Sequence, residues 1–174
     1  MSNPASNVSN ASASPSGTRS AQLLSLGFLT VLHEATGYVG GYLVTNQWGR
    51  PLEFRLSTPV QPNRVQQILY GDSLEPYICG ELIGMTLVEK TSQAVQVVIT
   101  DTKPGLELRT RIDLPVALLT NKAPLRSHPR FAEDTAVIDQ IMERVRGNLD
   151  LAEPFGRIRE AIAEARKLGV TSRG

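Results

Sequence analysis

The chain has 174 residues, of which 41% are hydrophobic and 20% charged, so it can form one globular domain with a buried core. Eighteen basic residues face 17 acidic ones, and a net charge of +1 lacks the basic excess typical of nucleic-acid and anionic-membrane binders. The single cysteine, Cys79, excludes an intrachain disulfide and a four-thiolate zinc site.

Residues 1–22 are rich in Ser, Asn and Ala and contain almost no large apolar side chain, which predicts a disordered tail. This segment lacks the charged start and apolar stretch of a secretory signal. No run in the chain approaches the ~20 apolar residues that span a bilayer. We therefore expect a cytoplasmic protein without membrane contact.

Three strands are predicted first, "GFLTVL" (27–32), "YVGGYLVT" (38–45) and "PLEFRLS" (51–57). The first is almost wholly apolar, as in a central strand, and the third alternates between apolar and polar residues. Gly37 and Gly49 lie in the two short connections and favour tight turns, so the three strands should form an antiparallel meander.

The remaining elements follow from apolar periodicity and from glycine and proline positions. They are helices over 63–71 and 72–90, strands over 94–101 and 113–120, and amphipathic helices over 131–146 and 151–167.

This order predicts an α/β (α+β) fold in which a mixed five-stranded sheet is covered by helices. We divide the chain into an α/β core (23–120), a linker (121–130) and a C-terminal helical hairpin (131–169). Three antiparallel strands followed by helix, strand, helix and strand is also the order of the ribonuclease H-like fold, although element order alone is weak support for a function.

Glu81 is the most unusual residue, because an advance of ~100° per residue places it inside the apolar arc of its helix. A carboxylate in a packing face must be paired, hydrogen-bonded or protonated. The favoured interpretation is a structural ion pair with Arg64 or Arg55. Gly80 and Gly84 lie beside Glu81 and would let a backbone or a ligand approach closely.

Asp101 ends the predicted fourth strand. Either Asp101 or Thr102 reads as a cap for the turn that Pro104 opens, and Asp101 could alternatively serve as a metal ligand. Glu81, Asp101 and Glu34 together suggest an alternative function, a Mg²⁺-dependent nuclease or phosphodiesterase of ribonuclease H-like fold. The first strand contains no aspartate, so the carboxylate that would bridge two metal ions is missing.

Three arginines, Arg50, Arg55 and Arg64, suggest a second alternative, a small-anion or nucleotide-binding sensor in which they gather on one side of the hairpin and first helix. The basic stretch 122–130 is broken by prolines and has no aromatic platform, so it reads as a solvated loop. His33 and His128 lack metal-ligand spacing, and Cys79 reads as a small buried hydrophobe.

The stretch from "GGYLVTNQWGRPLEF" to "ILYGDSLEPYICGELIG" resembles a group of uncharacterised bacterial proteins, of planctomycete type, with similar "GRPLEF" and "ILYG…LEPY…GE-IG" segments. The resemblance covers residues 26–120. It implies that the hairpin and the Glu81 helix form one unit, and it implies no activity and no catalytic residue.

The chain contains no G-x-S-x-G motif, no phosphate loop and no convergent catalytic set. We therefore expect a non-enzymatic cytoplasmic interaction or scaffold protein without a cofactor; Mg²⁺ enters only with the nuclease alternative. Its partner is expected to be another protein or a second copy of the chain, bound through the C-terminal helices, and not a nucleic acid.

Overall fold

The computed structural model describes residues 23–121 and 124–169, so the predicted tail (1–22) lies outside the described residues. Its centre is a six-stranded sheet with the order β3-β2-β1-β4-β5-β6. The strands are β1 (Ser25–Glu34), β2 (Gly37–Asn46), β3 (Pro51–Leu56), β4 (Val97–Thr100), β5 (Val116–Leu118) and β6 (Arg126–Ser127).

Strand directions confirm the predicted mixed α/β fold. β1, β2 and β3 form an antiparallel meander, whereas β4 pairs parallel to β1 and β5 pairs parallel to β4. β6 is a sixth strand, antiparallel to β5, and it lies within the segment predicted as a linker (121–130). Two residues are too few for an alternating pattern, which is why the sequence did not reveal this strand.

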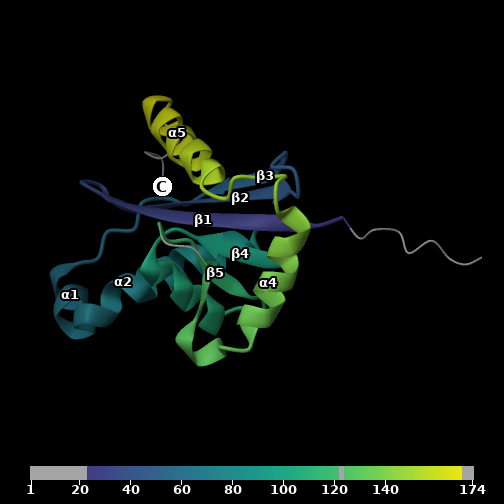
Figure 1. The fold of residues 1–174 in the computed structure, drawn as a ribbon. Coiled ribbons are helices and arrows are strands. Elements are labelled where there is room, and N and C mark those ends of the chain that lie inside the picture. The colour runs from purple at the N-terminus through teal and green to yellow at the C-terminus, as the bar shows by residue number, and fades with distance from the viewer. Residues whose placement is uncertain (1–22, 122–123, 170–174) are drawn as a thin grey trace, which may run out of the picture.

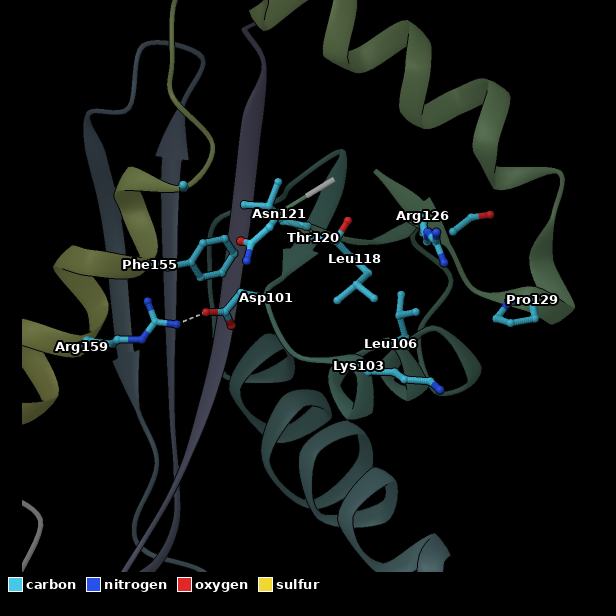
Figure 2. Close-up of a pocket in the computed structure, with 13 residues that line it drawn as sticks. Asp101, Lys103, Leu106, Leu118, Thr120, Asn121, Arg126, Pro129, Phe155 and Arg159 are labelled. Carbon is cyan, nitrogen blue, oxygen red and sulfur yellow. Dashed lines mark hydrogen bonds and ion pairs between the residues drawn. The ribbon is translucent and has the colours of Figure 1, made fainter. Parts of the chain in front are cut away.

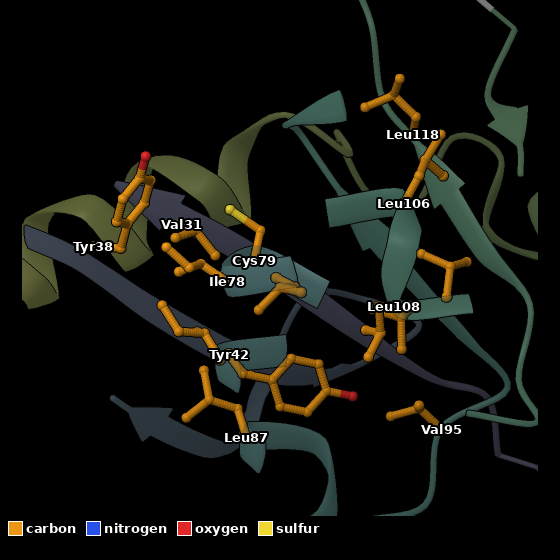
Figure 3. Close-up of a cluster of buried hydrophobic side chains, with 14 of the residues drawn as sticks. Val31, Tyr38, Tyr42, Ile78, Cys79, Leu87, Val95, Leu106, Leu108 and Leu118 are labelled. Atoms are coloured by element: carbon orange, nitrogen blue, oxygen red, sulfur yellow. The ribbon is translucent and has the colours of Figure 1, made fainter. Parts of the chain in front are cut away.

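One face of the sheet is covered by the later part of a continuous helical run and by the 3₁₀ helix η3 (Lys103–Thr110). The run comprises α1 (Arg64–Tyr70), η1 (Gly71–Ser73), α2 (Leu74–Pro76), η2 (Tyr77–Met85) and α3 (Thr86–Glu89). Figure 3 shows the core on this face, where side chains of η2 and η3 meet those of β1 and β2.

The segment "YICGELIGM", η2, is a π-helix rather than part of an ordinary α-helix. Its buried residues include two pairs five positions apart, Ile78 with Ile83 and Cys79 with Gly84. That spacing follows from i→i+5 hydrogen bonding, which places more residues in each turn than an α-helix does. The 100° projection used on the sequence is therefore wrong for this segment, and it misplaced Glu81.

The other face is covered by α4 (Asp134–Val145) and α5 (Glu153–Lys167). α5 lies over β1 and β2 (Figure 1), whereas α4 contacts β6. Their apolar stripes are buried in a second core formed with the sheet of the same chain. A short 3₁₀ helix, η4 (Pro129–Phe131), precedes α4.

Gly40 and Gly41 of β2 are points of close approach, one for each face. A Cβ on Gly40 would lie 2.2 Å from Cγ2 of Ile83, and a Cβ on Gly41 would lie 2.4 Å from Cγ2 of Ile158. The paired glycines therefore let η2 and α5 sit close to the sheet. The irregularity in the pairing of β2 with β3 lies elsewhere, between Val44 and Thr45.

Within the described residues, no helix is both long and apolar enough to cross a bilayer.

Candidate functional site

Glu81 lies at the rim of the helical layer and not inside it. Its side chain is 31% exposed, and its Oε2 forms an ion pair with Nη2 of Arg111 at 2.9 Å. An arginine partner was expected, but Arg64 and Arg55 were the wrong ones. Arg111 directly follows η3, and η3 approaches this part of η2 because Gly80 has no side chain: a Cβ there would lie 2.8 Å from the backbone nitrogen of Leu108.

A cavity of about 660 Å³ opens beside this ion pair. Its walls include Tyr70 and Tyr77, whose rings stack with 4.7 Å between centroids. A hydrogen bond with Tyr70 is the largest of the effects that raise the pKa of Tyr77, followed by burial. The Tyr77 hydroxyl is therefore a neutral hydrogen-bonding group at physiological pH, and it is not poised as a base.

Glu107, which also lines this cavity, is held by two basic residues from the segment after β5. It lies 3.4 Å from Nε2 of the buried His128 and 3.6 Å from Nη2 of Arg130. The backbone N–H of Arg130 donates to Nδ1 of His128, so Nε2 carries the proton that faces Glu107. The segment predicted as a solvated loop thus includes a buried structural histidine.

Asp101 lies on the opposite side of the sheet, beneath α5. Its carboxylate pairs with the guanidinium of Arg159, as the dashed line in Figure 2 marks. Thr102, the second of the two expected caps, is the N-cap residue of η3, but the expected side-chain hydrogen bond to the turn is not made. Glu34, at the end of β1, pairs with Arg166 of α5.

The three carboxylates of the predicted metal site are therefore not brought together. Glu81 belongs to the helical layer that contains η2, whereas Asp101 and Glu34 face α5, and each pairs with a different arginine. Over residues 23–121 and 124–169, no group of three or more His, Cys, Asp or Glu side chains could hold a metal ion.

The three arginines of the predicted anion site are also separate. Arg50 and Arg55 lie near the two ends of β3, roughly 17 Å apart at ~3.4 Å per residue. Arg55 pairs with Glu53 at 2.6 Å. Arg64 begins α1, which projects away from β3 (Figure 1).

Cys79, a residue of η2, is buried in the core, as the sequence predicted. Burial is the main cause that raises the pKa of its thiol to about 12, and the charge of Glu75 adds to the effect. A thiol of this kind is almost entirely protonated at neutral pH and is not an activated nucleophile.

A second and larger cavity, of about 840 Å³, lies where β4 and β5 end. Figure 2 shows it between α5 and the segment of β6 and η4, with Lys103, Arg126 and Arg159 among its lining residues. This site could not be predicted from the sequence, because Lys103 and Arg126 come together only through the parallel pairing of β4 with β5 and the antiparallel pairing of β5 with β6.

The most exposed apolar surface of the helical layer belongs to α1, which has no buried residue. Val65, Ile68 and Leu69 are 63%, 64% and 76% exposed, and Tyr70 is 37% exposed. Positions i, i+3 and i+4 share one face of a helix, so the first three form a continuous stripe. We call these four residues the α1 surface.

No protein-family model and no curated protein matches the chain. Among solved structures, it is similar to an endonuclease V of Ciona intestinalis in complex with a 23mer DNA that contains an inosine. The two share 12% identity over 72% of this chain and 56% of that chain, with a TM-score of 0.36. The chain thus spans just over half the length of that endonuclease chain, and a likeness of this degree supports no functional argument.

Proposed function

We propose that this protein is a non-enzymatic cytoplasmic interaction protein and that its docking element is the α1 surface. The observation that carries the proposal is the stripe of Val65, Ile68 and Leu69, each more than 60% exposed on a helix without a buried residue. A helix whose apolar face points to solvent is typical of a binding surface, because that face gains free energy only when a partner covers it.

α1 is held in shape before any partner arrives. The side chain of Asn63 accepts from the backbone N–H of Gln66 at 2.9 Å, and the side chain of Gln66 accepts from the N–H of Asn63 at 3.0 Å. This capping box stabilises a seven-residue helix that would not form in isolation. Binding therefore carries little additional cost for ordering the helix.

The partner we propose is a second copy of the chain. The stripe contains no charge, and it is flanked by the exposed Arg64 at one end of α1 and the exposed Asp72 just beyond the other. When two α1 helices pair antiparallel about a two-fold axis, Arg64 of each copy meets Asp72 of the other. Because each copy offers one positive and one negative charge at the ends of the stripe, a second copy complements this surface better than a partner whose surface is only acidic or only basic.

The C-terminal helices were the expected docking element, but their apolar stripes are covered by their own sheet. This leaves α1 as the better candidate surface. The nuclease alternative gains little support from the separated and arginine-paired carboxylates Glu81, Asp101 and Glu34. The anion-sensor alternative gains none from Arg50, Arg55 and Arg64, which do not share a site.

Sedimentation velocity tests the proposal. Because four side chains bury less area than a standard interface, we expect a weak monomer–dimer equilibrium, visible between about 5 and 300 µM protein. Leu69→Glu places two like charges across the two-fold axis and should abolish the dimer. The control Leu168→Glu changes a leucine of similar exposure (72%, against 76% for Leu69) on another part of the surface and should dimerise as the wild type does.

A charge swap tests the arrangement itself. Arg64→Glu and Asp72→Arg should each weaken the dimer, and the double variant should restore it, because the pair is then reversed and not lost. A wild-type chain that stays monomeric at the highest concentration would overturn the proposal. Equal loss of the dimer in Leu168→Glu would show that the α1 surface is not the interface.

A further inference from the structure

The cavity at the ends of β4 and β5 occupies a favoured place for a ligand. β1, β4 and β5 run parallel, so the carboxyl ends of β4 and β5 lie at the same edge of the sheet. In open α/β sheets, ligands bind in the crevice beyond these ends. A volume of about 840 Å³ suits a small organic molecule rather than a lone inorganic ion.

The positive charge of the side chains that line the cavity favours a negatively charged ligand. Among the described residues, the cavity is lined by the cationic side chains of Lys103, Arg126 and Arg159 and by one carboxylate, that of Asp101. Arg159 neutralises Asp101 through their ion pair, so the charges of Lys103 and Arg126 are in excess. A phosphomonoester carries ≈ −1.5 to −2 at pH 7, which matches two excess positive charges.

A second observation indicates that the ligand also carries hydroxyl groups. Oδ1 of Asp101 is buried and has no hydrogen-bond partner among residues 23–121 and 124–169, although its other oxygen binds Arg159. A buried carboxylate oxygen without a donor is costly, and a ligand hydroxyl would supply the missing donor. Asn121 and Ser127 add further polar groups to the same wall, and Leu106 and Leu118 provide an apolar floor.

From this geometry we propose that the cavity binds a hydroxyl-bearing phosphomonoester, that is, a sugar phosphate or a nucleoside monophosphate. The phosphate lies between Lys103 and Arg126, and a sugar hydroxyl donates to Oδ1 of Asp101. This site is separate from the α1 surface and uses none of its residues.

Isothermal titration calorimetry with ribose 5-phosphate, AMP and adenosine tests the proposal. Ribose 5-phosphate and AMP should both bind saturably, and adenosine, which lacks the phosphate, should bind at least ~10-fold more weakly, since charge-assisted hydrogen bonds to phosphate are lost. Inorganic phosphate should also bind more weakly than ribose 5-phosphate, because it cannot place a hydroxyl at Asp101.

A matched pair of double variants locates the site. Lys103→Gln with Arg126→Gln should weaken ribose 5-phosphate binding at least ~10-fold, since two charged hydrogen-bond donors are removed. Arg50→Gln with Lys90→Gln removes the same charge from exposed positions outside the cavity and should leave binding unchanged. Equal binding by the first variant and the wild type, equal affinity for adenosine and AMP, or no saturable binding would each overturn the proposal.

Discussion

The guanidinium of Arg109 and the carboxylate of Asp134 form an ion pair that joins η3 to the start of α4. Nε and Oδ2 lie 2.6 Å apart, and the two side chains are only 13% and 7% exposed. Arg109 also donates to the carbonyl of Ile112 at 3.0 Å and lies 3.9 Å above the ring of Phe131. The side chain of Arg109 thus holds η3, which follows β4, against the start of α4, which follows β6.

Removal of Asp134 should therefore destabilise the fold strongly, because it leaves the buried charge of Arg109 without the carboxylate that balances it. We expect Asp134→Ala to lower the free energy of unfolding by about 3 kcal/mol, measured by urea denaturation. The control Glu143→Ala breaks the exposed pair with Arg146 and should cost no more than about 0.5 kcal/mol. Similar losses in both variants would contradict the role given to the Arg109–Asp134 pair.

Gly41 and Gly156 should respond in opposite directions to the same substitution. A methyl group at Gly41 collides with Ile158, so Gly41→Ala should cost about 1–3 kcal/mol of stability. Gly156 lies within α5 with nothing within 4 Å of a Cβ, so Gly156→Ala should stabilise the helix by up to about 1 kcal/mol. Thermal unfolding of the two variants checks this, and a stable Gly41→Ala protein would mean that α5 can move away from β2 at little cost.

Glu53 should make stability depend on pH. Desolvation alone would raise its pKa, but hydrogen bonds from the side chains of Ser92 and Arg55 and from the backbone N–H groups of Gln93 and Ser92 together lower it from 4.5. A carboxyl whose folded-state pKa is lowered contributes stability above its unfolded pKa, and this is lost as pH falls through the folded pKa. Glu53→Gln should thus be less stable than the wild type at pH 7, and the difference should shrink as the solution is acidified below 4.5. A difference that does not change with pH would contradict this.

Cys79 should react only when the chain unfolds. Its buried thiol, with a pKa of about 12, should resist a thiol reagent such as dithionitrobenzoate at pH 8 and react rapidly in denaturant. The rate in native buffer then reports opening of the core around η2. A fast reaction in native buffer would show that η2 opens locally without global unfolding.

The parts of the fold that could be predicted are those in which a local pattern matches a regular period. The apolar run of β1 and the glycines at the meander turns fixed three neighbouring strands, and apolar stripes revealed α4 and α5. The position of Glu81 was not predictable, because an apolar pattern analysed at α-helical spacing does not indicate where the hydrogen bonding changes to i→i+5.

The partners of the site residues depend on segments far apart in the chain. Arg111 reaches Glu81 because η3 packs on η2, and Arg159 reaches Asp101 because α5 crosses the sheet. Nothing near Glu81 or Asp101 in sequence indicates these arginines. The buried Asp134 was missed for the same reason, since at a helix start it reads as an ordinary exposed acid.

Gly40 and Gly41 have no side chains, so two helical layers from distant parts of the chain pack directly on the backbone of β2. η2 bears on one and α5 on the other, so the separation of these two helices is fixed locally by a single peptide unit. Any side chain added at either residue widens the sandwich and strains the packing of one whole layer. For this reason β2, rather than either helix, limits which substitutions the three layers can accept at this point.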